Sequence, residues 1–185
     1  LDGDEYVVSG HKIVISLFKQ AGSVIDFART DFSAQPSKGI SAFVLEKTPD
    51  AAGDGLTILR KLPKMSMRAI HSYEFRLDDV RIPAKNLLGE PGEGFPIALK
   101  TLDYGRLSIA AQALGTASGA MQYAVGHAKV REQFGRPIGA FQAIQFKLAD
   151  MAIEIEAARQ LLYAAAHKAA DGAEGFSTEA AMAKC

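Results

Sequence analysis

The stretch NLLGEPGEGF, residues 86–95, divides the chain into two parts with different sequence patterns. It contains three glycines and Pro91, residues that interrupt regular structure. Before it, short runs rich in β-branched and aromatic residues predict strands, whereas after it the apolar residues recur at helical spacing. The sequence therefore predicts an α+β protein of two domains. An antiparallel β-barrel or sandwich occupies residues 1–88, and an antiparallel helical bundle, incomplete in this chain, occupies residues 89–185.

Upstream of this stretch, the β-rich runs are separated by clusters of Pro, Gly, Asp and Ser. EYVVS and KIVIS lie on either side of Gly10, which predicts a hairpin that turns at this glycine. The further runs are SVIDFAR (23–29), ISAFVLE (40–46), LTILR (56–60), SYEFRL (72–77) and VRI (80–82). Because no helix of crossover length separates them, they predict antiparallel pairing and not βαβ units.

Downstream, a first helix is predicted from about Glu93 to near Arg131, and a second begins between Pro137 and Ala140. A third opens with STEAAMAK, which Ser177 can cap, after glycines 172 and 175 have ended the second. Two long helices and a short third one cannot enclose a four-helix core, so the apolar seam requires partners from further residues or another subunit. The predicted core positions are Leu99, Leu102, Ile109, Leu114, Met121 and Val125, then Phe141, Ile144, Leu148, Met151, Ile155, Ala158, Leu162 and Ala165.

The composition excludes several classes of function. Lys and Arg together number 21, as do Asp and Glu, so no net charge favours nucleic acid or an acidic membrane. Cys185 is the single cysteine, which excludes a disulfide framework and fits a reducing compartment. The four histidines are scattered without ligand spacing, so no metal site is expected.

The chain shows no targeting or membrane segment in its sequence. It begins with LDGDEYVVSG, which lacks an initiator Met, a basic start and an apolar signal core, and this suggests a piece of a longer chain. The longest run without acidic or basic residues, residues 107–128, is mostly Ala, Gly, Ser and Gln. That composition favours a helix packed in a protein core over a membrane span.

The segment LDYGR, residues 102–106, is a candidate binding site. Asp103 and Arg106 are three residues apart on one helical face, so both can meet one ligand or each other. Gly105 leaves a notch in the helix at a cost of about 1 kcal/mol relative to Ala, which close approach of a ligand would explain. From the residues alone, a surface ion pair is favoured over a ligand site.

The connection between the two long helices, VREQFGRPIGAFQ, is the second candidate. Arg131 can simply complement the helix dipole, with Phe134 as an apolar plug and Gly135 as the stop. Alternatively, Arg131 grips a phosphate while Phe134 and Gln142 contact a ring and its polar edge. The residue types leave these two interpretations balanced.

Nearly the whole sequence resembles a known family. The region from LLGEPGEGF to EAARQLLYAAA, residues 87–166, is similar to acyl-CoA dehydrogenases, and to short-chain, butyryl-type members in particular. KGISAFVLEK, KMSMR and LDDVRIPAKNLLGE match the family's middle domain, so the resemblance covers nearly the whole chain. It implies the middle β domain and about half of a C-terminal four-helix bundle, from a protein that is usually a homotetramer with one FAD per subunit.

The resemblance also implies a reaction, the α,β-dehydrogenation of an acyl-CoA thioester in fatty acid β-oxidation. A carboxylate removes the α-proton, the β-hydrogen leaves as hydride to flavin N5, and electrons pass to an electron-transfer flavoprotein. The implied location is the bacterial cytoplasm or the mitochondrial matrix, with no nucleic acid partner and no membrane insertion.

Site residues follow from the matched motifs. RxxFG implies that Arg131 binds the FAD diphosphate, typically of a neighbouring subunit, that Phe134 lines the same site, and that Gln142 contacts the nucleotide portion. KIVIS matches the strand that lies against the isoalloxazine ring, with the Ser16 hydroxyl near flavin N5. The implied ring contacts are Val14, Ile15 and Ser16, and the implied acyl-CoA contacts are Asp103, Tyr104, Gly105 and Arg106.

Two departures from the family pattern matter. Val14 stands where the family usually has tryptophan. The general-base glutamate normally follows far downstream, beyond Cys185, and Gly105 occupies the position that carries the base in a minority of members. No residue of this chain is therefore predicted to be catalytic. The alternatives are an acyl-CoA oxidase or another flavoenzyme of this fold, to which the Val14 departure gives weight, or a non-catalytic flavin-binding, CoA-binding or assembly protein.

Overall fold

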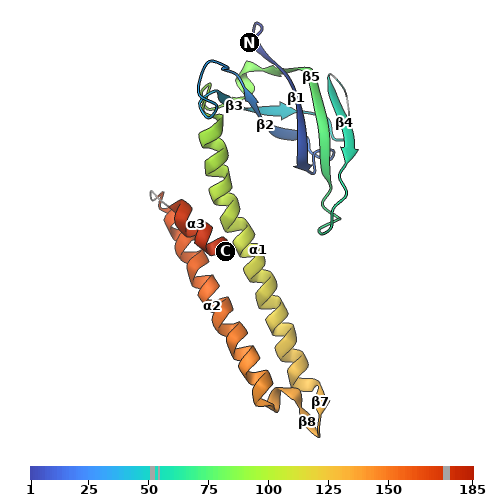
Figure 1. Ribbon diagram of the computed structural model, residues 1–185, viewed down its shortest axis with the longest axis vertical. Helices are drawn as coiled ribbons and strands as arrows, with labels where there is room; N and C mark the ends of the chain where they lie inside the picture. The colour runs from blue at the N-terminus through green and yellow to red at the C-terminus, as the bar shows by residue number, and fades with distance from the viewer. Residues whose placement is uncertain (51–52, 54, 173–175) are drawn as a thin grey trace. The chain divides into compact units, whose positions relative to one another are not determined.

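The computed structural model describes residues 1–185 except 51–52, 54 and 173–175. The chain forms two compact units, Leu1–Ala98 and Leu99–Cys185 (Figure 1). Strands are the main regular structure of the first unit and helices that of the second, as predicted. The predicted domain boundary between residues 88 and 89 stays a prediction.

The β unit consists of two antiparallel three-stranded sheets (Figure 1). One has the order β1-β5-β4 and the other the order β2-β3-β6, and every pairing is antiparallel, which confirms the predicted pairing mode. The strands are β1 (Glu5–Ser16), β2 (Ser23–Arg29), β3 (Ile40–Glu46), β4 (Leu56–Lys61), β5 (Ser72–Pro83) and β6 (Leu87–Leu88).

The predicted hairpin at Gly10 is wrong. β1 runs through this glycine as one strand of 12 residues, paired along its length with β5, which likewise joins SYEFRL and VRI into one strand. The pairing register shifts between Val8 and Gly10, where the Ser9 hydroxyl donates to Asp79 Oδ1 at 2.7 Å. Gly10 stays paired, with Leu77, and the extra residue at this shift belongs to β5, where Asp79 has φ 51°. This partner strand is too distant in sequence for a local pattern to reveal.

The core of the β unit is aromatic and aliphatic. The Phe18 and Phe75 rings stack with centroids 3.7 Å apart and an interplanar angle of 10°. Side chains from both sheets complete the cluster, which is formed by Val8, Phe18, Phe43, Leu45, Leu56, Tyr73, Phe75, Leu77, Val80 and Ile82. Burial of this apolar surface, at about 25 cal/mol per Å², is the main stabilising term of the unit.

On sheet β1-β5-β4, a row of charged side chains crosses all three strands. Glu74 on β5 is 8% exposed and pairs with Arg60 on β4, while its Oε1 lies 2.8 Å from Nε2 of His11 on β1. The hydrogen bond and charge of Arg60 hold the pKa of the Glu74 carboxyl below its ordinary value of 4.5. The charged carboxylate is therefore bound more tightly in the folded state than in the unfolded chain.

We expect Glu74→Gln to lower stability at neutral pH and to lose this effect in acid. Because the folded pKa is depressed, the contribution is complete above about pH 4.5 and disappears as the pH falls through the folded value. The difference between the unfolding midpoints of the two proteins should shrink as the pH is lowered from 7 into the acid range. Glu46→Gln, at the exposed end of β3, is the control, and a Glu74→Gln deficit that did not shrink as the pH fell below about 4.5 would contradict the assignment.

After the short 3-10 turn η1 (Ala84–Asn86) and β6, the chain enters α1 (Gly94–Val130). A Cβ at Gly94 would lie 2.6 Å from the carbonyl carbon of Ser41, and the Gly92 amide donates to Ser41 Oγ at 2.9 Å. The glycines of GEPGEGF thus allow the start of the helix to lie directly against β3, which favours a structural role for this segment.

The remaining elements form the helical unit. They are β7 (Glu132–Gln133), β8 (Arg136–Pro137), the 3-10 turn η2 (Ile138–Ala140), α2 (Gln142–Ala170) and α3 (Phe176–Lys184). The predicted extents of the two long helices are therefore confirmed within a few residues. Gly172 follows α2 with φ 66°, whereas position 175 lies outside the described residues. None of the helices, over the part of the chain that the structure describes, is long and apolar enough to cross a membrane.

The helical unit buries only one stripe of its apolar residues. Ala110 and Leu114 of α1 pack with Leu162 of α2 and, at the edge, with Ile155 and Ala183. The predicted core positions Leu114, Leu162 and Ala165 are buried, as expected. Several others are exposed, with values of 47% for Leu99, 57% for Leu102 and 52% for Ile109. They lie on faces of α1 that the described residues leave uncovered, so further apolar partners would bury them.

Candidate functional site

The connection between α1 and α2 is a tight β-hairpin. Gln133 pairs with Arg136, and the two residues between them, Phe134 and Gly135, both have positive φ, at 53° and 77°. Two consecutive positive φ angles match the turn geometry of a two-residue hairpin, and positive φ is uncommon for a bulky residue such as phenylalanine. The Ile138 amide donates to the Arg131 carbonyl at 2.8 Å and ties the hairpin to the end of α1.

This hairpin presents a cation and an aromatic ring to the outside. The Phe134 side chain is 91% exposed, and the Arg131 guanidinium is exposed and forms no ion pair within the part of the chain that the structure describes. Gln142, the first residue of α2, is exposed as well. Burying a phenylalanine side chain contributes about 1.5–3 kcal/mol of favourable free energy. A ligand or partner surface that covers Phe134 would therefore bind with much of this free energy.

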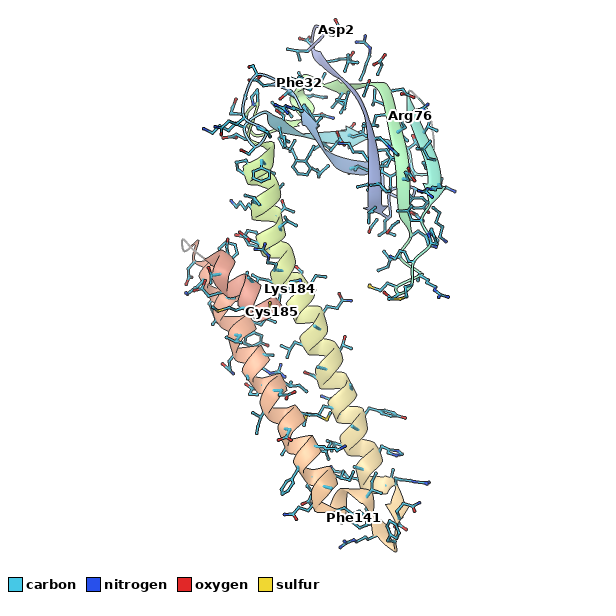
Figure 2. The ribbon with its side chains drawn as sticks, viewed as in Figure 1. Asp2, Phe32, Arg76, Phe141, Lys184 and Cys185 are labelled. Atoms are coloured by element: carbon cyan, nitrogen blue, oxygen red, sulfur yellow. The ribbon has the colours of Figure 1, made fainter. Side chains whose placement is uncertain are left out.

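Two residues that the sequence did not single out as ligands support the hairpin. The Arg136 guanidinium carbon lies 4.3 Å from the centroid of the Phe141 ring. The Phe134 and Phe141 rings meet edge to face, with centroids 6.1 Å apart (Figure 2, which labels Phe141). These contacts orient the exposed Phe134 ring against Phe141, which in turn lies under the Arg136 guanidinium. The sequence signal was available, because Arg136 follows Phe134 by two residues and therefore falls in the same hairpin.

The end of β1 carries the second group of candidates. Val14 has φ 64° and is 65% exposed, at a register shift between Lys12 and Ile15 in the pairing with β5. Ile15 packs against the aromatic core, whereas Ser16 is exposed. A contact with a planar ring on this surface would therefore use the Val14 and Ser16 side chains but only the backbone of Ile15.

In the LDYGR segment, the predicted ion pair is present. Arg106 donates to Asp103 Oδ1, and the Ser177 hydroxyl of α3 donates to Asp103 Oδ2. Ser177 is thus the second residue of α3 and bonds to α1, so its prediction as the helix cap is wrong. The Tyr104 and Phe176 rings lie 5.3 Å apart and join the same two helices.

Gly105 and Arg106 of this segment both reach the surface. A Cβ at Gly105 would meet nothing within 4 Å, which leaves a bare strip of helix backbone. The Arg106 side chain is 36% exposed, so it can contact a ligand while it stays paired with Asp103. The ion-pair interpretation and the ligand interpretation are therefore compatible in this geometry.

The structure does not bring the two groups of the helical unit together. Arg106 and Arg131 are 25 residues apart along α1, which corresponds to about 40 Å at 1.5 Å per residue. One small ligand cannot contact both arginines of the same chain. Among the described residues, no group of three or more His, Cys, Asp and Glu side chains could hold a metal ion.

The sequence comparison decides the family. Residues 92–185 match the model of the acyl-CoA dehydrogenase C-terminal domain, which accounts for half of the chain. The chain belongs to the acyl-CoA dehydrogenase family. Over 184 residues it is 48% identical to the mitochondrial short-chain specific acyl-CoA dehydrogenase of Bos taurus, covering 99% of this chain and 43% of that protein.

Solved acyl-CoA dehydrogenase structures share the fold. Butyryl-CoA dehydrogenase from Megasphaera elsdenii superposes with a TM-score of 0.88 at 46% identity, covering 99% of this chain and 46% of that one. A chain from a structural study of the electron-transferring flavoprotein of Acidaminococcus fermentans gives 0.89 at 49% identity, with coverage of 100% and 47%. The chain thus spans about half the length of the relatives that it matches.

The residues at the hairpin fit the dinucleotide cofactor that the family fold implies. An unpaired guanidinium suits a diphosphate, because charge-assisted hydrogen bonds to phosphate are about twice as strong as neutral ones. The exposed Phe134 ring and the Gln142 amide suit a planar heterocycle and its polar edge. The exposed groups of this connection are therefore chemically suited to a flavin dinucleotide.

Proposed function

We propose that the complete protein is a FAD-dependent dehydrogenase that introduces an α,β double bond into a short-chain acyl-CoA thioester. The observation that carries this proposal is the whole-chain similarity to short-chain and butyryl-CoA dehydrogenases. The unpaired Arg131 beside the exposed Phe134 supports it independently.

The bound flavin would supply the hydride acceptor. The residues of this chain bind and orient. Arg131 would compensate the diphosphate charge of a neighbouring subunit's FAD, Phe134 would line the same site, and Gln142 would contact the nucleotide portion. At the flavin ring bound by the β unit, the Ser16 hydroxyl would donate a hydrogen bond, and the Val14 side chain and the Ile15 backbone would contact the ring. At the other group, Arg106 contacts the acyl-CoA, oriented by Asp103 and flanked by Tyr104 and Gly105.

The base that removes the α-proton is assigned to a glutamate outside this chain. At Gly105 the open helix surface carries no acid. Asp103 is already bound to Arg106 and Ser177, which makes it a positioning residue rather than a base.

The proposal includes further subunits and a redox partner. The apolar residues of the helical unit that remain exposed suit a homotetramer, in which Arg131 serves the FAD of a neighbouring subunit. Electrons then pass to an electron-transfer flavoprotein, in the bacterial cytoplasm or the mitochondrial matrix.

The test is turnover of the purified complete protein with CoA thioesters of increasing chain length. With an artificial electron acceptor, we expect reduction that is fastest for short chains. Oxygen uptake with peroxide formation, independent of an added acceptor, would instead select an acyl-CoA oxidase. A protein without turnover under either condition would overturn the proposal.

Arg106→Ala should raise the apparent KM for acyl-CoA by roughly tenfold or more while FAD stays bound. The reason is the loss of a charged hydrogen bond, which is worth about 1.5–3 kcal/mol. Arg159→Ala is the matched control, since Arg159 and Glu156 form a pair of the same spacing on α2. An unchanged KM in Arg106→Ala would contradict the contact with acyl-CoA and favour the interpretation of Arg106 as half of a surface ion pair.

A further inference from the structure

The two sheets of the β unit are joined at their edges by an ion pair between the half-buried Lys12 and the buried Asp26. β1 is an edge strand of one sheet and β2 an edge strand of the other (Figure 1). Lys12 Nζ on β1 lies 3.0 Å from Asp26 Oδ1 on β2 and donates to the Phe27 carbonyl at 2.7 Å. A pocket of about 470 Å³ opens between the two strands, and Lys12, Phe27 and Arg29 are among the residues that line it.

Asp26 depends on this lysine. The residue is 3% exposed, and Oδ2 is buried and accepts no hydrogen bond from the described residues. A buried carboxylate without its cation is strongly unfavourable, so removing either partner of such a pair destabilises a protein far more than loss of a surface pair does. Asp26 interrupts the apolar run SVIDFAR, which is the only sequence sign of the pair.

The residues that follow Lys12 are strained. The register with β5 shifts between Lys12 and Ile15, and inside this bulge Val14 has φ 64°. A β-branched residue at positive φ is a genuine outlier, and such a conformation persists only where its surroundings determine it. Beyond the bulge, Ile15 packs into the core and the Leu17 amide donates to the His71 carbonyl at 2.8 Å. Before it, the side-chain anchor is Lys12.

We propose that Lys12 and Asp26 are positioning residues that hold the β1 bulge in the strained form, and thereby place Val14 and Ser16 against the flavin ring. This inference rests on the proposed function, since the ring is its reference point. The pair touches neither substrate nor cofactor, and it acts through the backbone of residues 13–16.

The first experiment uses the complete, FAD-loaded protein. We expect Lys12→Met to retain FAD and an unchanged KM for butyryl-CoA, but to lower kcat about tenfold and to shift the flavin absorption maximum. Lys12→Arg, which keeps the charge and the donors, should restore most of both. Lys19→Met is the matched control, because Lys19 and Asp50 form an exposed pair at 3.8 Å in the same unit.

The second experiment needs no flavin. In a double-mutant cycle of Lys12→Met and Val14→Gly, glycine removes the strain at position 14 because it adopts positive φ freely. We expect the unfolding equilibrium constants to depart from additivity by about tenfold, with Lys12→Met less harmful beside glycine. If Lys12→Met does not fold, the cycle is run with Asp26→Asn, which removes the other charge of the pair and keeps the size of the side chain.

The outcomes separate the two proposals. If the protein without substitutions carries no FAD and shows no turnover, the proposed function is wrong. If the protein without substitutions is active and the Lys12→Met variant has the same kcat and the same flavin spectrum, the positioning role is wrong. Additivity within about twofold in the cycle breaks the link between the ion pair and the bulge.

Discussion

Phe75→Ala should lower the free energy of unfolding of the β unit by about 3–5 kcal/mol, the largest stability effect expected in this chain. Phe75 is 1% exposed and stacks on Phe18, which is 0% exposed, at a centroid distance of 3.7 Å. Alanine would remove the transfer free energy of the ring and leave a cavity that rigid strands on both sides cannot close.

Hydrogen exchange of the β5 amides in the complete protein measures this effect, because it reports the opening of one unit separately from the others. Phe32→Ala is the control, since Phe32 is 79% exposed and an exposed substitution is usually within about 0.5 kcal/mol of neutral. Equal loss of β5 protection in the two variants would contradict the description of the aromatic core.

Arg131→Ala should weaken FAD binding by roughly ten- to a hundredfold, the largest functional effect expected. The guanidinium has no protein partner among the described residues, so its charge is available for the diphosphate. Loss of a charged hydrogen bond of about 1.5–3 kcal/mol corresponds to that range. The measurement is the flavin retained after dialysis, followed by titration of the stripped protein with FAD.

Lys129→Ala is the control for Arg131→Ala. Lys129 is another exposed cation in the last turn of α1, so the substitution Lys129→Ala removes one positive charge from the same end of the helix. Its variant should keep its flavin. If both variants lost FAD to the same degree, general electrostatic attraction would explain the effect better than a specific contact at Arg131.

The sequence predicted the elements whose signals are local. β2 and β3 match the predicted runs. The start of α1 was predicted within one residue, because glycines and a proline just before it mark the boundary. Gly10 shows the limit of such signals. Its neighbours resemble a hairpin, but a distant strand of equal length pairs with both halves of β1.

The candidate site divides in the same way. Residue types and the family resemblance predicted Arg131, Phe134 and Gln142, which the structure places at the connection between α1 and α2, with Phe134 in the hairpin turn. The sequence could not show the positive φ of Phe134 or of Val14, since each depends on strand pairing. Nor could it show that Ser177 of α3 donates a hydrogen bond to Asp103 of α1, since the two residues are 74 positions apart in sequence.

The central claim, a flavin-dependent acyl-CoA dehydrogenase, is tested most directly by anaerobic titration of the purified complete protein with butyryl-CoA while the flavin absorbance is followed. The account predicts that FAD is present and that its oxidised absorbance falls on addition of this thioester alone. A protein that carries no flavin, or whose flavin stays oxidised at saturating butyryl-CoA and at every other chain length, would contradict it.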